Sequence, residues 1–347
     1  MRVARVACLV ALFALLAASW SPVRAADMPL VRVGYNPLGA GNTIFFIADR
    51  MGFFETEGLR VDLLPFDSSI NQVAPLATGQ LDVSGASPSA TFYNEVARGN
   101  GMRIVADLGR DPPGYGFLAL LVRSDLVKSG RYKSPKDLKG MRIAIIAPGT
   151  ASWATLIVLL KKNGLTYADI KPLVLKYSEH LAALRDRTVD ASFMPEPGAT
   201  QIALSGVAER VVSNDAFYLN QEIVVVMYSA DFIKNRKDVA SKFMRAFLRA
   251  SRFYNDALSG GKFSGPNADA IIKILTDATP IKDPAVIRAS VPYGTDPNGA
   301  LNVGSMREDL EMFREARFIH GSVRAEQAVQ PSFASQAVQQ LGRYQTK

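Results

Sequence analysis

One short stretch of the chain, "APGTASW" at Ala147–Trp153, combines a turn, two hydroxyls and an indole directly before a helix-like segment. Gly149 permits the turn, Thr150 and Ser152 supply the hydroxyls, and Trp153 supplies an aromatic surface. The first backbone N–H groups of a helix have no partner within it and carry a partial positive charge. The stretch therefore predicts one lip of an anion-binding cleft, with an ordinary capped helix and a buried tryptophan as the alternative.

The same stretch lacks the partners that a catalytic serine or a phosphate loop requires. The sequence contains no G-x-S-x-G turn and no G-x-x-x-x-G-K-[ST] loop. Its two histidines, His180 and His320, stand far apart, and neither belongs to an H-E-x-x-H motif; His180 is expected on a helix surface. We therefore expect no catalytic residue, no metal site and no cofactor, and the chain is predicted not to be an enzyme.

Residues 1–25 have the composition of a secretory signal peptide. They contain arginines and no acid, an apolar core of about fifteen residues, and small residues that suit cleavage. A retained membrane anchor is the alternative, although the apolar run is short for a membrane span. The single cysteine, Cys8, lies in this leader. The mature chain is therefore expected to have no disulfide and no thiolate, and to be exported to the bacterial periplasm.

The net charge indicates little about a partner. The formal charge of +8 falls by the three arginines of the leader to +5 in the mature chain. The basic residues of 234–252 alternate with apolar residues at helical spacing, which indicates a solvated helix face. No nucleic-acid partner is expected.

Strand-like and helix-like runs alternate from residue 30 onward, which is the pattern of an α/β fold with mostly parallel sheets. The pattern occurs twice. The run from Val31 matches the run from Met141 at an offset of 110 residues, and Asp82 matches Asp190 at an offset of 108. Two similar α/β lobes explain both offsets.

Two apolar runs, Phe117–Val122 and Glu222–Asp231, are expected to carry the chain from one lobe to the other and back. The expected division places 26–117 and 229–347 in lobe one, with the C-terminal helices packed on it, and 118–228 in lobe two. Two crossing segments make a hinge, and the cleft between the lobes is the expected ligand site.

Ligands of open α/β sheets lie beyond the carboxyl ends of the strands, where loops lead into helices. Polar and aromatic side chains in such loops are the candidate ligand contacts, with helix capping as the alternative for Asn42 and for the hydroxyls around Ser68. Ser87 precedes a proline in a first helical turn, where free N–H groups bind oxyanions. The full set of expected ligand contacts is Tyr35, Asn42, Ser68, Ser87, Tyr115, Gly149, Thr150, Ser152, Trp153, Pro195 and Glu196.

The carboxylate of Glu196 carries a specific expectation about the ligand. By the internal repeat, Pro195 and Glu196 should face the same cleft as Ser87. A carboxylate there would accept hydrogen bonds from an amine and would repel a simple inorganic anion. A solvated position at the lip of the cleft is the alternative.

Several segments resemble a known family. "VRVGYNPLGAGNTIFFIADRMGFFETEGLRVDLLPF", "PLATGQLDVSGAS", "SPKDLKGMRIAI" and "DASFMPEPGAT" are similar to the periplasmic solute-binding proteins of nitrate, sulfonate and taurine ABC importers. The resemblance covers about Leu30 to Ala250 and is weaker over the last hundred residues. It implies the two-lobed type II binding-protein fold, in which two hinge crossings join the lobes.

The resemblance also implies a function. A monomeric receptor would close its lobes around a small organic anion or zwitterion, such as a sulfonate, taurine or an aromatic carboxylate. It would then deliver this solute to a membrane permease with a cytoplasmic ATPase. A thiamine-type pyrimidine precursor, nitrate and bicarbonate are alternative ligands. A sensory protein that presents its ligand and a cleft enzyme on the same fold are alternatives of another class.

Overall fold

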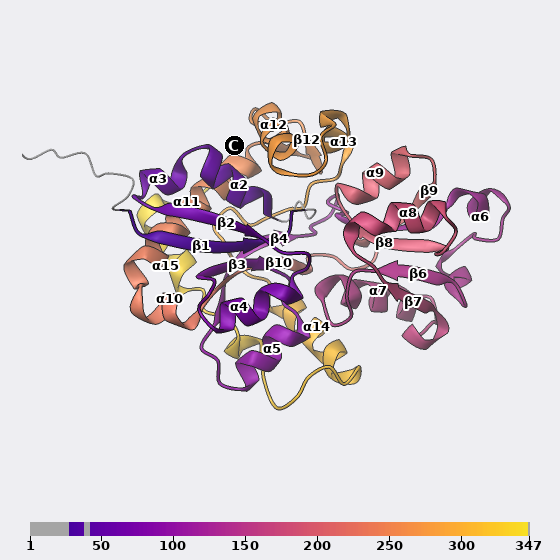
Figure 1. The fold of residues 1–347 in the computed structure, drawn as a ribbon, viewed down its shortest axis with the longest axis horizontal. Coiled ribbons are helices and arrows are strands. Elements are labelled where there is room, and N and C mark those ends of the chain that lie inside the picture. The colour runs from indigo at the N-terminus through magenta and orange to yellow at the C-terminus, as the bar shows by residue number, and fades with distance from the viewer. Residues whose placement is uncertain (1–27, 38–41, 346–347) are drawn as a thin grey trace, which may run out of the picture.

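A computed structural model describes residues 28–37 and 42–345; the expected leader lies outside these ranges. Two five-stranded sheets, each flanked by helices, lie side by side along the long axis of the molecule (Figure 1). The expected α/β architecture of two mostly parallel sheets is confirmed. Within the described residues, no helix is both long enough and apolar enough to span a membrane.

The first sheet has the strand order β2-β1-β3-β10-β4. Its first three strands run parallel, and β10 runs antiparallel between β3 and β4. The strands are β1 (Leu30–Tyr35), β2 (Arg60–Pro65), β3 (Val83–Ala86), β4 (Arg103–Arg110) and β10 (Glu222–Tyr228).

The second sheet repeats this order as β7-β6-β8-β5-β9, with β5 as the antiparallel strand between β8 and β9. The antiparallel strand of the first sheet, β10, comes after the strands of the second sheet in the chain. The antiparallel strand of the second sheet, β5, comes directly after β4 of the first sheet. The strands are β5 (Leu118–Arg123), β6 (Arg142–Ile145), β7 (Lys171–Val174), β8 (Ala191–Pro195) and β9 (Ala208–Ser213).

Strand register confirms the internal repeat. Val33 pairs with Val83 between β1 and β3, and Ile143 pairs with Ala191 between β6 and β8. These pairs are related by the offsets of 110 and 108 residues that the sequence shows. The two sheets are thus copies of one unit, and their corresponding loops can be compared directly.

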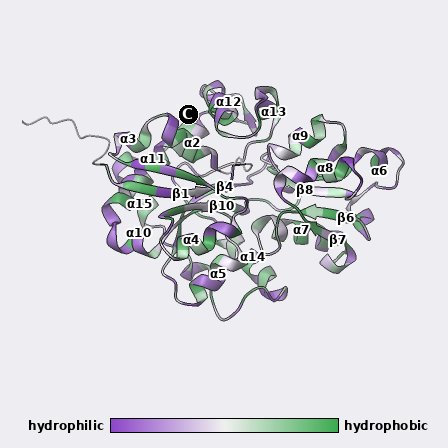
Figure 2. Ribbon diagram, in the orientation of Figure 1, coloured by the Kyte–Doolittle hydropathy of each residue, from purple (hydrophilic) through white to green (hydrophobic). Residues whose placement is uncertain are grey.

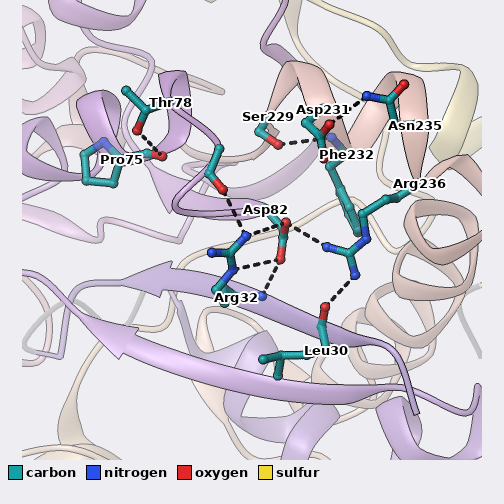
Figure 3. Close-up of polar contacts among 11 residues, drawn as sticks. Leu30, Arg32, Pro75, Thr78, Asp82, Ser229, Asp231, Phe232, Asn235 and Arg236 are labelled. Atoms are coloured by element: carbon teal, nitrogen blue, oxygen red, sulfur yellow. Dashed lines mark hydrogen bonds and ion pairs between the residues drawn. The ribbon is translucent and has the colours of Figure 1, made fainter. Parts of the chain in front are cut away.

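An aspartate directly before the third strand anchors each copy, buried in the first and partly buried in the second. Figure 3 shows Asp82, which accepts hydrogen bonds from the backbone and side chain of Arg32 and pairs with Arg236 at 2.9 Å. Asp190 accepts the equivalent bonds from Arg142 and also pairs with Arg123. Two arginines per carboxylate offset its desolvation, which a buried charge requires.

The chain crosses between the sheets at 111–117 and returns at 214–221. The return lies before the expected boundary at residue 228, because β10 hydrogen-bonds to β3 and β4 and belongs to the first sheet. The apolar run at Glu222–Tyr228 is therefore a central strand, buried on both faces, rather than a connection.

Helices cover both faces of each sheet and turn apolar residues toward them (Figure 2). The first sheet carries α2 (Thr43–Arg50), α3 (Phe53–Thr56), α11 (Lys237–Asn255) and α12 (Ala268–Ala278) on one side, and α4 (Val73–Ala77) and α5 (Ala90–Ala97) on the other (Figure 1). α10 (Ala230–Asn235) and α15 (Ser332–Leu341) pack on α11. The second sheet carries α6 (Ser124–Lys128), α7 (Ala151–Lys162), α8 (His180–Arg185) and α9 (Gly198–Leu204).

The C-terminal part contacts both halves of the molecule. α11 and α15 pack on the first half, as expected, but α13 (Pro284–Ala289) also contacts α9, and α14 (Val303–Glu315) contacts α7. Figure 1 shows α13 and α14 on opposite sides of the junction between the two sheets. The last hundred residues therefore join the two halves rather than only extending the first.

Candidate functional site

A cavity of about 50 Å³ lies between the two sheets, at the carboxyl ends of their parallel strands. The loops that follow β1, β2, β3, β6 and β7 contribute to it, together with the last residue of β8 and the strands β5 and β10 where they leave the crossings. Its lining consists of Asn36, Asn42, Ser68, Ser69, Ile70, Gly85, Ser87, Phe117, Leu118, Ile146, Ala147, Thr150, Ser152, Tyr177, Pro195, Ile223 and Val224. Six of the expected ligand contacts are therefore brought together: Asn42, Ser68, Ser87, Thr150, Ser152 and Pro195.

The lining is neutral. Hydroxyls and amides form one part of it, and the aliphatic and aromatic side chains of Phe117, Leu118, Ile146 and Ile223 form another. Among the described residues that line the cavity there is no acid, lysine, arginine or histidine. An anion held here would be bound by neutral donors and by helix starts, without a charged partner.

The two halves contact each other directly beside the cavity. The Ala90 N–H, at the start of α5, donates to the Gly149 carbonyl at 2.8 Å, and the Ala151 N–H, at the start of α7, donates to Ser87 Oγ at 2.9 Å. Each half thus supplies an acceptor to the helix start of the other. Gly149 does not line the cavity; its backbone makes this contact with a left-handed φ of +69°.

The start of α7 offers fewer donors than the sequence suggested. Thr150 caps the helix by accepting from the Trp153 N–H and donates to the Ala147 carbonyl, and its hydroxyl lies 3.0 Å from that of Ser152. The Ala151 N–H donates to Ser87. Within this described turn, the N–H groups of Thr150 and Ser152 therefore have no protein acceptor. The turn therefore offers an anion two free N–H groups rather than all four of residues 150–153.

The indole of Trp153 is not a wall of the cavity. Its ring is buried against Tyr167, Phe313 and Phe318, at centroid distances of 5.6, 6.1 and 5.1 Å. Burial of this side chain among three aromatic rings removes it from the solvent-facing side of α7. For Trp153 the alternative expectation, a core tryptophan on a capped helix, is the correct one.

The carboxylate of Glu196 points away from the cavity. It is fully buried, accepts from the backbone and hydroxyl of Thr200 at 2.9 Å each, and forms an ion pair with Arg210. The Val291 N–H also donates to it, which joins the C-terminal part to the second half. The expectation that Glu196 accepts bonds from a ligand amine is therefore corrected: Thr200 and Arg210 already satisfy this charge inside the protein.

Two expected aromatic contacts are replaced by their neighbours. Tyr35 does not line the cavity and packs edge-on against Phe46 at 5.1 Å, while the next residue, Asn36, does line it. Tyr115 remains in the crossing segment, and Phe117 enters the cavity instead. In both cases the sequence predicted the correct loop but the wrong residue within it. Which residue of a loop faces the cavity depends on where the strand ends.

The loop after β2 and the start of α2 contribute their polar side chains to the cavity rather than to caps. Ser69 and Ile70 line it beside Ser68, and no side chain caps the short 3-10 turn that follows, Ile70–Gln72. Asn42 sits at the N-cap position of α2 without a capping bond. In the amide orientation that satisfies both its groups, Asn42 donates to the Gly85 carbonyl and accepts from the Asn36 N–H, each at 3.2 Å.

Three further lining residues come from a strand and a loop that the sequence analysis did not connect with the site. Ile223 and Val224 come from β10, whose place in the first sheet the sequence did not reveal. Tyr177 follows β7, and the loops after β2 and β7 correspond in the internal repeat, so Ser69 and Tyr177 could have been found together. These same loops meet at the cleft mouth, where Lys176 and Asp67 form an exposed ion pair at 3.3 Å.

A buried polar network lies under the return crossing. Asp309 of α14 accepts from the Tyr218 hydroxyl and from the Gln221 amide, both at 2.8 Å, and the Gln221 amide also donates to the Ala151 carbonyl at the start of α7. Burial raises the pKa of Asp309 to about 8, against the lowering effect of its two donors. This network connects α14, the crossing and the helix that borders the cavity. Among the described residues, no group of three or more histidine, cysteine, aspartate and glutamate side chains is arranged to hold a metal.

Comparison with known proteins places this geometry in context. The sequence model of a family described as NMT1/THI5 like matches residues 40–256. No curated protein matches the sequence. Solved structures with a similar fold include binding proteins and an enzyme.

The alkanesulfonate-binding protein SsuA from Xanthomonas axonopodis pv. citri, bound to MOPS, is 20% identical with a TM-score of 0.68, over 87% of this chain and 99% of that one. The periplasmic nitrate-binding protein NrtA from Synechocystis PCC 6803 is 14% identical with a TM-score of 0.75, over 91% and 90%. The desulfurization enzyme DSZB is 14% identical with a TM-score of 0.62, over 90% and 99%. At these identities the likeness shows the shared periplasmic binding-protein fold.

Proposed function

Because this chain belongs to the NMT1/THI5-like family, we propose that it is the extracytoplasmic solute-binding protein of an ABC importer. The observation that carries the proposal is the enclosed, neutral cavity between the two halves, lined from the carboxyl ends of both sheets. Its fold neighbours include proteins described as binding alkanesulfonate and nitrate, which supports a solute of the same chemistry. Periplasmic location, a permease with its ATPase as partner, and a monomeric state belong to this proposal.

The ligand that suits the cavity is a small monoanion with an oxyanion group. Two N–H groups of the α7 start, the hydroxyls of Ser68, Ser87 and Ser152, and the amides of Asn36 and Asn42 surround the space. Neutral donors together with a helix start bind a single negative charge and still release it. Sulfonates and carboxylates are the leading candidates. A zwitterion such as taurine loses support, because no carboxylate among the described lining residues faces its ammonium group.

A small inorganic anion is the second candidate, and cavity size favours it. A volume of about 50 Å³ has room for roughly four water-sized groups at 10–15 Å³ each. Nitrate and bicarbonate have four heavy atoms. An organic anion with a long hydrocarbon tail needs more space than this cavity alone supplies.

Binding, rather than catalysis, is what the lining can perform. General acid–base catalysis requires a titratable group within hydrogen-bond reach of the reacting atoms. Among the described lining residues the sole titratable side chain is Tyr177, and burial raises its pKa to about 12. The similarity to DSZB shows that the fold can host an enzyme, but these residues supply no base for one.

A thermal-shift screen of the purified protein tests the ligand class, with calorimetry for each hit. The panel contains alkanesulfonates, taurine, aromatic carboxylates, nitrate, bicarbonate and an aminopyrimidine. We expect a monoanion to bind, and Ser152→Ala to weaken its affinity roughly tenfold to 100-fold, since one hydrogen bond to a charged group is lost. Thr150→Ala with Ser152→Ala should weaken it further and also lower the melting temperature through loss of the cap.

The matched control is the pair Thr56→Ala and Ser241→Ala, two exposed hydroxyls on helices far from the cavity. This control should leave the affinity unchanged. An unchanged affinity in the Thr150→Ala, Ser152→Ala protein would show that the ligand does not contact the start of α7.

A further inference from the structure

A second cavity lies directly beyond one wall of the first. It has a volume of about 250 Å³ and, like the first, is lined by Tyr177. The other lining residues come from the second half and from the segment between α12 and α13: Ser178, Leu181, Met194, Gly198, Gln201, Ile202, Pro280 and Ile281. On β8, Pro195 lines the first cavity and the adjacent Met194 lines the second. One tyrosine and one strand therefore separate the two spaces.

The chemistry of the second cavity differs from that of the first. Leu181, Met194, Ile202, Pro280 and Ile281 give it an apolar surface. Among its described lining residues no side chain is charged, and the polar side chains besides that of Tyr177 are those of Ser178 and Gln201, both exposed. The space therefore suits a hydrocarbon group and offers little to a charged one.

The side chain of Tyr177 is held by apolar contacts alone. It lies in a single turn of 3-10 helix, and its side chain is partly buried against apolar residues of the second half. Within the described residues its hydroxyl makes no hydrogen bond to a protein group. A change of its side-chain rotamer therefore breaks no hydrogen bond and costs only apolar contact.

We propose that the two cavities form one ligand site for an amphiphilic organic anion, with Tyr177 as the gate between them. The oxyanion head lies among the hydroxyls and amides of the first cavity, and the hydrocarbon tail passes Tyr177 into the second. Together the two cavities reach the lower end of the size range of an ordinary ligand site, roughly 300–1,000 Å³. The inference rests on the proposed function, because it assigns a site for the tail of the ligand whose anionic head binds in the first cavity.

A series of n-alkanesulfonates from methanesulfonate to octanesulfonate tests this inference by calorimetry. These probes keep one charged head at every pH used and differ only in chain length. In the unaltered protein, affinity should rise by roughly fourfold for each methylene that enters the apolar cavity. Tyr177→Ala, which joins the cavities, should raise the affinity for the longer members of the series relative to the affinity for methanesulfonate.

Gln201→Trp closes the second cavity from an exposed position on α9, so folding should be preserved. This variant should remove the gain in affinity with chain length and leave the affinity for methanesulfonate unchanged. Leu204→Trp is the matched control, because Leu204 is 63% exposed on the same helix and does not line the cavity. That variant should behave like the unaltered protein.

The outcomes separate the two proposals. Binding of methanesulfonate with an affinity that is flat or falls with chain length, and is insensitive to Gln201→Trp, would overturn the tail site and leave the proposed function standing. If no member of the series and no other anion of the panel binds, the proposed function fails, and the tail site fails with it.

Discussion

His180 and Gln72 occupy the same position in the two copies of the repeated unit. The Ser84 hydroxyl donates to Gln72 Oε1 at 2.7 Å, and Ser192 Oγ lies 2.8 Å from His180 Nδ1. Both side chains are fully buried, and each lies 108 residues from its counterpart. The expectation of a surface histidine is thus wrong, and the histidine serves as a packing and hydrogen-bonding residue of the second half.

His180 should make the protein sensitive to acid. Burial lowers its pKa from 6.5 to about 4. Between pH 4 and 6.5 the unfolded chain therefore binds a proton that the folded protein does not, so stability falls as pH falls through this window, by up to about 1.4 kcal/mol per pH unit. His180→Gln, which copies Gln72, should fold and lose stability less steeply when urea unfolding is measured at pH 7, 6 and 5. Equal pH dependence in both proteins would show that His180 titrates normally.

At the residue scale, the sequence identifies which loops form the site better than which side chains enter it. Hydroxyl and amide residues in loops after strands have no use in the core, so Asn42, Ser68, Ser87, Thr150 and Ser152 could be placed from type and position. Trp153 and Glu196 could not, because their partners come from residues 210, 313 and 318, which no local pattern connects to them. A side chain that is polar or aromatic can always be satisfied inside the protein by a distant partner.

At the element scale, the starts of α5 and α7 define how the two halves meet. Gly149 is required here for two reasons: its φ is +69°, and a Cβ atom would lie 3.1 Å from that of Ala90 in the other half. Its carbonyl also accepts from the Ala90 N–H. A small residue in left-handed conformation therefore permits the close approach of the two helix starts.

Gly149→Ala should damage ligand binding beyond its effect on stability. The left-handed conformation costs an alanine about 1–2 kcal/mol, and the added methyl also pushes the halves apart. Gly140→Ala is the control, since Gly140 has a φ of +76° and open space around its Cβ position. Both variants should show a similarly lowered melting temperature, but only Gly149→Ala should weaken the affinity for the ligand. Equal affinities in the two variants would contradict the role of this contact.

The elements themselves were largely predictable. Parallel strands buried on both faces appear as continuous apolar runs, and glycines at helix ends mark the helices. The matched offsets then predicted two copies of one sheet. The place of β10 could not be predicted, because an antiparallel strand inserted between β3 and β4 from more than 110 residues away shows the same apolar run as a crossing segment.

At the scale of the whole molecule, the two halves are joined by more than two crossings. α13 contacts α9, α14 contacts α7, and Asp309 of α14 accepts from Tyr218 and Gln221 in the return crossing. Any movement of one half relative to the other must bend or slide these contacts. The buried network around Asp309 places an ionisable group among these contacts.

Asp309→Asn should change the pH dependence of stability in the direction opposite to His180→Gln. The folded pKa of about 8 exceeds the ordinary value of 3.8, so between these values the folded protein holds a proton that the unfolded chain has lost. The contribution of Asp309 to the free energy of unfolding therefore falls as pH rises from 4 to 8 and is constant above pH 8. The asparagine variant resembles the protonated carboxyl, so its free energy of unfolding should drop less between pH 5 and pH 8. An identical drop in both proteins would place the pKa of Asp309 near its ordinary value.

We propose that the two halves close around a small anion at the cavity between them. Fluorescence energy transfer between dyes on Met51→Cys and Leu204→Cys tests it, because these residues are 42% and 63% exposed and lie on the first and second halves. Cys8 is replaced by serine so that only these two positions react. Saturating anion, with binding shown by calorimetry, should raise the transfer efficiency, since ligand contacts from both halves favour the closed state. The Thr150→Ala, Ser152→Ala protein should need a higher anion concentration for the same change. A transfer efficiency that does not change when the anion is bound would contradict the account.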